Sequence, residues 1–160
     1  MKATQFNLFK SAHRGLRALF ADTLIQLQKT DFSIAEEAAA AIERVRVVLQ
    51  QVQAHSKWEN DFIFPALGKE CLSMTDYFTS QHYHNDTLTL SLDILICEFE
   101  EMKADAQKES AANNILCAFI EFIAYNFKHM NMEDQLINPL LWIKYTDTEL
   151  EILKTYSNEH

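Results

Sequence analysis

Apolar side chains recur every three or four residues along four long stretches of this chain, which is the spacing of an amphipathic helix. The first stretch covers about residues 4–29, with apolar positions from Phe6 to Leu27. After a break at residues 31–33, the second stretch runs to about Pro65. The sequence therefore predicts two consecutive helices joined by a short turn.

Two further long helices are predicted in the second half of the chain. The third begins between Ser73 and Ser80. Polar residues at 103–114 hold the next turn, and the fourth helix runs from Ile115 to about Pro139. Because proline lacks the N–H that continues a helix, the second helix is expected to end near Pro65, with Gly68 following as a stop signal, and the fourth near Pro139.

Two capping boxes mark helix starts. Ser33 with Glu36 predicts the start of the second helix. Thr146 with Glu149 predicts a short C-terminal helix over about residues 147–156.

Composition supports a fold built from helices alone. The chain has 160 residues, with only two glycines and two prolines, too few turn residues for many hairpins. This length suits one domain with a substantial core. Long helices joined by short turns place neighbours antiparallel. We therefore expect an all-α single domain: an up-and-down antiparallel four-helix bundle over about residues 4–145, followed by the short C-terminal helix.

Charge and cysteine content narrow the choice of partners. The net charge is -9 with no basic run, which argues against nucleic acid or an anionic membrane as a partner. No apolar stretch has the length of a membrane span or the character of a signal peptide. The three cysteines form no Cys-x-x-Cys pair, so disulfides are not expected, and a cytoplasmic location is predicted.

Two segments, residues 55–67 and 129–141, repeat one pattern. In each, Glu follows His by four residues, Ile follows Glu by four, and Pro and then Leu follow at equal offsets. Residues four apart lie on the same face of a helix. His55 with Glu59, and His129 with Glu133, therefore each aim an imidazole and a carboxylate at one point.

One histidine on each long helix is predicted to lie at the same level of the bundle. In an antiparallel pair of helices, residues equidistant from the turn lie at the same height. The midpoints of His13 with His55, of His55 with His84, and of His84 with His129 fall at 34, about 70 and about 106. All three positions lie in predicted turns.

Together these residues predict a site for two metal ions. Its ligands would be His13, His55, Glu59, His84, His129 and Glu133. Imidazole and carboxylate ligands suit iron, manganese, zinc or copper. His13 and His55 would cap one ion, His84 and His129 the other, and the two glutamates would bridge them. Positions left open would take a small ligand such as dioxygen, and the lack of cysteine argues against an iron–sulfur cluster.

The third helix offers His82 as the alternative to His84. The two lie ~200° apart around a helix, so only one can face the centre. His84 is in phase with Leu88 and Leu92, whereas choosing His82 would turn Asp86 toward the core. The expectation is therefore His84.

Three aromatic residues are candidates for the wall of the pocket around the metal. Phe20 and Phe62 each follow a ligand histidine by seven residues, and Tyr125 precedes His129 by one turn.

The order His, His-x3-Glu, His, His-x3-Glu on four helices resembles the hemerythrin-like domain family, also called the HHE cation-binding domain, over about residues 6–141. The resemblance implies a four-helix bundle that holds a non-haem di-iron centre, two iron ions with an oxo or hydroxo bridge; manganese or zinc are possible alternatives. Members of the family bind dioxygen, sense oxygen, nitric oxide or iron, or help to repair damaged iron centres.

The chain differs from the oxygen carriers of that family. Those carry two histidines four apart on the third helix, whereas here Ser80 and Leu88 flank His84 at that spacing. Their second bridging carboxylate is an Asp five residues after the histidine, whereas here it is Glu133, four residues after His129. One iron would therefore lack a histidine, which argues against reversible oxygen carriage and leaves an exchangeable position.

The expected function is a non-haem di-iron protein that binds or senses a small ligand, dioxygen or nitric oxide, or iron itself, with no separate catalytic residue. The alternative is a di-iron enzyme, an oxidase or peroxidase-like activity, that uses the same open site. Haem binding between opposed histidines would leave Glu59 and Glu133 buried without purpose.

Overall fold

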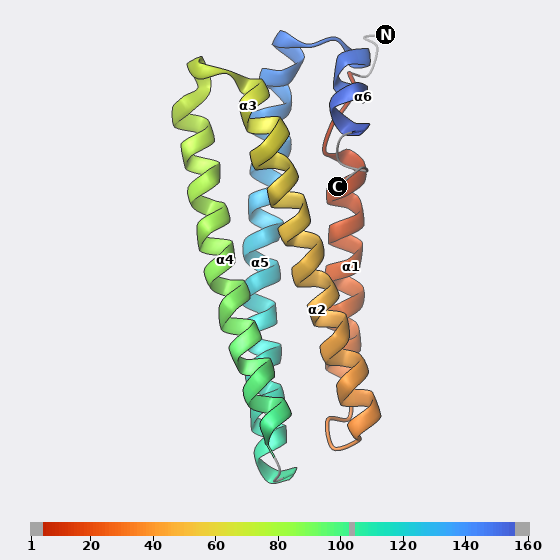
Figure 1. Ribbon diagram of the computed structural model, residues 1–160. Helices are drawn as coiled ribbons and strands as arrows, with labels where there is room; N and C mark the ends of the chain where they lie inside the picture. Colours follow the sequence, from red (N-terminus) through yellow and green to blue (C-terminus); the bar gives the residue numbers. More distant parts are fainter. Residues whose placement is uncertain (1–4, 103–104, 156–160) are drawn as a thin grey trace.

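Helices make up the architecture of this chain. The computed structural model describes residues 5–102 and 105–155, and within these ranges it contains helices and no strand. The helices are α1 (Lys10–Lys29), α2 (Ala35–Trp58), α3 (Phe64–Leu67), α4 (Leu72–Glu101), α5 (Asp105–Lys144) and α6 (Asp147–Thr155). The long helices α1, α2, α4 and α5 lie side by side, and successive ones are joined at alternate ends (Figure 1). The all-α class predicted from the sequence is confirmed, and the fold is a helical bundle.

Helix α1 begins later than the sequence predicts. It starts at Lys10 rather than near residue 4, which lies outside the described residues. The side-chain oxygen of Asn7 accepts a hydrogen bond from the Lys10 N–H (2.9 Å), and the Leu8 N–H donates to the side chain of Asn138 on α5 (3.3 Å). These bonds hold the segment before α1 in a non-helical path against another helix.

Only one of the two predicted capping boxes forms. The N–H of Thr146 donates to Glu149 (2.8 Å) and the N–H of Glu149 donates back to the Thr146 hydroxyl (3.4 Å), so the box before α6 is confirmed. The box of Ser33 and Glu36 is wrong. Both the N–H and the hydroxyl of Ser33 donate to Asp31 instead (2.9 and 2.6 Å), in a local turn that satisfies them before α2 begins.

Neither proline itself ends its helix, although the stop predicted at Gly68 is confirmed. Pro65 lies in the first turn of α3, where a helix does not need its N–H, and the stop comes at Gly68 with φ 80°. Pro139 lies inside α5, which continues to Lys144. The buried side chains Ile137 and Leu141 on either side of Pro139 anchor this part of α5, so packing outweighs the lost backbone hydrogen bond.

The turn between α4 and α5 is much shorter than the predicted polar stretch at residues 103–114. Helix α5 begins at Asp105, and α4 begins at Leu72, one residue before the predicted window. Ala111 and Ala112 are both buried and give the polar stretch a side that packs against the bundle. These two alanines indicate a buried helix face less clearly than the leucines and phenylalanines of the other helices do, so the start of α5 was missed.

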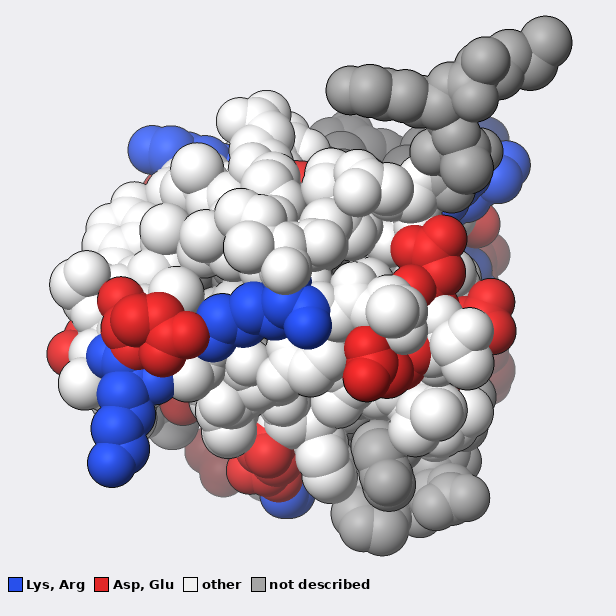
Figure 2. Space-filling view, turned by 90° about the horizontal axis from the view of Figure 1, so that it is seen from above, with Lys and Arg blue, Asp and Glu red and all other residues white. Residues whose placement is uncertain are grey.

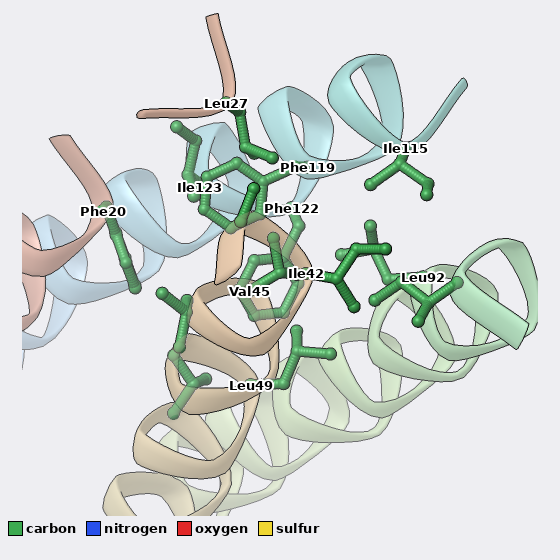
Figure 3. Close-up of a cluster of buried hydrophobic side chains, with 14 of the residues drawn as sticks. Phe20, Leu27, Ile42, Val45, Leu49, Leu92, Ile115, Phe119, Phe122 and Ile123 are labelled. Carbon is green, nitrogen blue, oxygen red and sulfur yellow. The ribbon is translucent and has the colours of Figure 1, made fainter. Parts of the chain in front are cut away.

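The apolar core is divided into two clusters. Side chains of all four long helices point toward one another in the larger cluster, among them Phe20, Ile42 and Phe122 (Figure 3). The smaller cluster includes Phe78 and Leu141 and lies toward the end that carries α3 and α6. Along each long helix, a buried or half-buried histidine lies between the residues of the two clusters, so a polar layer separates them.

Charged side chains of both signs lie at the end of the molecule viewed in Figure 2. Basic and acidic side chains are interspersed there among uncharged ones. Within the described ranges, no helix combines the length and the apolar character needed to cross a membrane.

Candidate metal centre

Six ionisable side chains meet in the polar layer between the two apolar clusters. Their ligand atoms form two groups, and within each group these atoms lie within 4.8 Å of one another. The groups are His13, His55, Glu59 and Glu133, and Glu59, His82, His129 and Glu133. Both glutamates belong to both groups, which is the arrangement that two neighbouring metal ions require.

The structure brings five of the six predicted side chains together, and on α4 it uses His82 in place of His84. His82 is 4% exposed, whereas His84 lies on the surface with its ring 4.8 Å from that of Tyr125. The prediction chose the wrong face of α4 because the buried face carries the polar residues Asn85 and Thr89 in phase with His82. Of the two leucines used to set the helical phase, Leu88 is only half-buried, and Leu92 is buried on the face that carries His82.

The first half of the centre lies between α1 and α2. The Nε2 atoms of His13 and His55 lie 3.0 Å apart. The Nε2 of His55 is 3.0 Å from Oε1 of Glu59, and the Nε2 of His13 is 3.3 Å from Oε2 of Glu133.

The second half, between α4 and α5, repeats this geometry. The Nε2 atoms of His82 and His129 lie 3.1 Å apart. The Nε2 of His129 is 3.0 Å from Oε1 of Glu133, and the Nε2 of His82 is 3.3 Å from Oε2 of Glu59. Each glutamate therefore presents one oxygen to each half. The distances in the two halves match, so the centre has approximate twofold symmetry.

The two carboxylates are buried with imidazole nitrogens as their near partners. Glu59 and Glu133 are fully buried, and among the described residues their oxygens lie beside imidazole nitrogens, the nearest at 3.0 Å, without a hydrogen bond of regular geometry. Burying an unpaired carboxylate is strongly unfavourable. A cation in each half would satisfy these oxygens and the converging imidazole nitrogens together. The donor set therefore fits a pair of metal ions.

The crowding of carboxylates and imidazoles also shifts their proton affinities. Burial alone would lower the pKa of His13, but the carboxylates around it, Asp134 foremost, raise it to about 10. Burial alone would raise the pKa of Glu59, but the imidazoles around it, His55 foremost, hold it well below its usual range. Without a metal ion, protons held on imidazoles such as that of His13 supply the positive charge that balances the buried carboxylates.

Outer contacts orient His13 and His82 through residues that the sequence did not point to. The Nδ1 of His13 lies 3.1 Å from Oδ1 of Asp134, and Oδ2 of the same carboxylate accepts a hydrogen bond from Arg17 (2.8 Å). The Nδ1 of His82 lies 3.0 Å from the side-chain oxygen of Asn60. A proton held on Nδ1 leaves Nε2 free to bind a metal. One signal was present, because Asn60 and Asp134 each directly follow the glutamate of the repeat.

The three predicted wall residues have different surroundings. Phe20 is fully buried in the larger apolar cluster, 6.3 Å from the ring of Phe122. Phe62 is half-buried against the smaller cluster. Tyr125 stacks on the ring of His129, with 6.5 Å between centroids and 7° between planes.

The backbone changes its winding where the first glutamate leaves α2. Glu59–Ile63 form a π-helical turn, in which the Phe64 N–H donates to the Glu59 carbonyl five residues before it. Such turns occur often at functional sites because they rotate the side chains that follow. Glu59 and Asn60 both belong to this turn and contact imidazoles of the centre.

Comparison with known proteins supports this geometry. No curated protein matches the chain. The model of the hemerythrin HHE cation-binding domain matches residues 4–141, which confirms the resemblance found in the sequence. This chain therefore belongs to the hemerythrin HHE cation-binding domain family.

Proposed function

We propose that this chain holds two iron ions, one in each half of the centre, within an up-and-down antiparallel four-helix bundle. The observation that supports this is the pair of four-residue groups that share Glu59 and Glu133. The oxygens of these glutamates face both halves and have no other partner among the described residues. Bridging carboxylates would hold the two ions close together.

The donor atoms favour iron without excluding related ions. Each half offers two imidazole nitrogens and two carboxylate oxygens, a set that suits iron, manganese and zinc. Four protein donors leave positions of an octahedral ion open. Bound iron would supply redox change and a binding position for a small ligand such as dioxygen or nitric oxide.

The protein's own contribution is to orient the ligands and to exclude water. Phe9 stacks on the ring of His13 (4.9 Å), and Phe64 stacks on the ring of His82 (5.4 Å). The apolar clusters on both sides of the polar layer limit the approach of solvent. A water-poor site strengthens charge interactions and favours a small, weakly polar ligand.

We propose a binding or sensing module as the role of this centre, in a reducing compartment such as the cytoplasm. All three cysteines are unpaired, in keeping with such a compartment. The alternative is a di-iron enzyme that oxidises an organic substrate at the same site.

Anaerobic reconstitution with ferrous iron tests the proposal. We expect about two irons per chain and, in air, near-ultraviolet absorption of ferric iron without the Soret band of haem. One tightly bound zinc with no uptake of iron would contradict it. Oxygen consumption that accelerates when an organic substrate is added would favour the enzyme.

A further inference from the structure

A cavity of about 440 Å³ lies between α1 and α2 and reaches His55. Its apolar walls include Leu8, Leu16 and Trp58. Lys154 of α6 also lines it and is the one fully charged side chain among the described residues that do so. The volume falls in the range of small-molecule sites.

The corresponding place in the second half of the centre is filled by a side chain. Gln81 directly precedes His82, and its amide oxygen lies 2.7 Å from Nδ1 of His129. Ala12 directly precedes His13 at the equivalent position and lines the cavity. The first half therefore has a methyl group where the second has an amide.

A second difference enlarges the cavity. His84 lies two residues after His82 and contacts Tyr125, whereas the residue two after His13 is Gly15. A Cβ added at Gly15 would meet no other atom within 4 Å. The cavity occupies space on α1 that two larger side chains fill on α4.

Among the described residues, His55 is the one imidazole of the centre whose Nδ1 has no side-chain hydrogen-bond partner. The Nδ1 atoms of the other three, in His13, His82 and His129, each have a side-chain oxygen within 3.1 Å. The structure shows no such partner for Nδ1 of His55 among the described residues, and His55 lines the cavity. If Nε2 of His55 binds a metal, as the proposed function requires, the ring proton resides on Nδ1 and becomes a donor.

We infer that this cavity binds a small organic carboxylate with an apolar body. One carboxylate oxygen accepts a hydrogen bond from Nδ1–H of His55, the role that the Gln81 amide has at His129. Lys154 attracts the negative charge, and the apolar walls bury the body of the ligand. Occupancy of the cavity thereby completes the outer contacts of the first half.

Zinc-loaded protein and hexanoate test this inference, since zinc is diamagnetic and suits these ligands. Calorimetry should show hexanoate binding about tenfold more tightly than hexan-1-ol, because a charged acceptor strengthens the hydrogen bond. Hexanoate should also shift the amide NMR signals of Ala12 and Gly15. Acetate, which lacks the apolar body, should not shift them at the same concentration. Equal affinity for hexan-1-ol, or an equal shift with acetate, would overturn the inference.

Two substitutions fill the cavity in different ways. Ala12→Gln supplies the amide of the other half, and Gly15→Leu supplies apolar bulk alone. Each should weaken hexanoate binding by about tenfold or more while zinc content stays unchanged. The matched control is Ala39→Gln on the exposed face of α2, which should bind hexanoate as the unaltered chain does. Unchanged binding in both cavity variants would refute the site.

The metal-free protein separates this inference from the proposed function. Hexanoate should still shift the signals of Ala12 and Gly15, about tenfold more weakly, because no metal ion on Nε2 polarises the His55 ring and strengthens its hydrogen bond to the carboxylate. A chain that takes up no metal would refute the proposed function, while these shifts would still report on the cavity. Equal affinity in both forms would overturn the link between the cavity and the centre.

Discussion

The two halves of the centre place similar donor atoms at similar distances but hold them with different outer charges. His13 is backed by the carboxylate of Asp134, which is paired with Arg17, whereas His82 is backed by the neutral amide of Asn60. A carboxylate behind an imidazole makes it a stronger metal ligand than an amide does. The inner ligands follow from the spacing of the repeat, while the residue after each glutamate decides how the halves differ.

The backbones of the two repeats differ as well. After His55 the chain passes through a π-helical turn into the short α3, whereas after His129 it stays in α5. Both backbones deliver a glutamate to the centre. The spacing His-x3-Glu is therefore compatible with two different continuations of the helix.

The largest expected effect comes from removing either shared carboxylate. Glu59→Ala and Glu133→Ala should each reduce metal content from about two ions per chain to below one, because each glutamate serves both halves. Metal analysis after gel filtration measures this, and circular dichroism verifies that the helices persist. Loss of a single ion in either variant would show that the halves do not share that carboxylate.

A smaller effect is expected from a histidine that serves one half. His82→Ala should remove most of the metal from the second half and leave about one ion per chain. His84→Ala is the matched control and should keep both ions, since His84 lies on the surface. The reverse result would mean that α4 is rotated relative to this structure.

The sequence alone predicted the features for which one residue pattern favoured a single structure. Heptad-like apolar spacing gave the four long helices, and the doubled His-x3-Glu gave four of the six inner side chains. The prediction failed where two faces of one helix had similar apolar patterns and tertiary packing determined which face is buried. On α4, the buried face carries Asn85 and Thr89, and Asn85 accepts a hydrogen bond from Asn126 (2.7 Å), a contact that no spacing rule reveals.

The outer contacts were beyond prediction for a related reason. The bond between His13 and Asp134 joins residues 121 positions apart. Such a contact depends on the rotation of two helices about their axes, and a single sequence with no structure leaves that rotation undetermined. The same limit applies to the cavity beside His55, which arises from small side chains whose neighbours are distant in sequence.

A moderate effect is expected when the outer charge is exchanged. Asp134→Asn should weaken metal binding in the first half by about tenfold, because an amide polarises His13 less than a carboxylate does. Asn60→Asp should strengthen binding in the second half. Competition titration with a chromophoric chelator resolves the two steps. Equal metal affinities of the two halves in the unaltered chain would contradict the idea that Asp134 makes His13 a stronger ligand than Asn60 makes His82.

The smallest expected effect concerns the two prolines of the repeats and has opposite signs. Pro139 lies inside α5 and lacks the N–H of one backbone hydrogen bond, so Pro139→Ala should restore that bond and raise the free energy of unfolding by about 1 kcal/mol. Pro65 lies in the first turn of α3, where proline fits and restricts the unfolded chain. Pro65→Ala should therefore lower the free energy of unfolding by about 0.5 kcal/mol. Urea unfolding of the metal-free protein measures both, with metal content of the loaded protein as the control. Equal signs would show that the two helix continuations tolerate proline in the same way, despite their different winding.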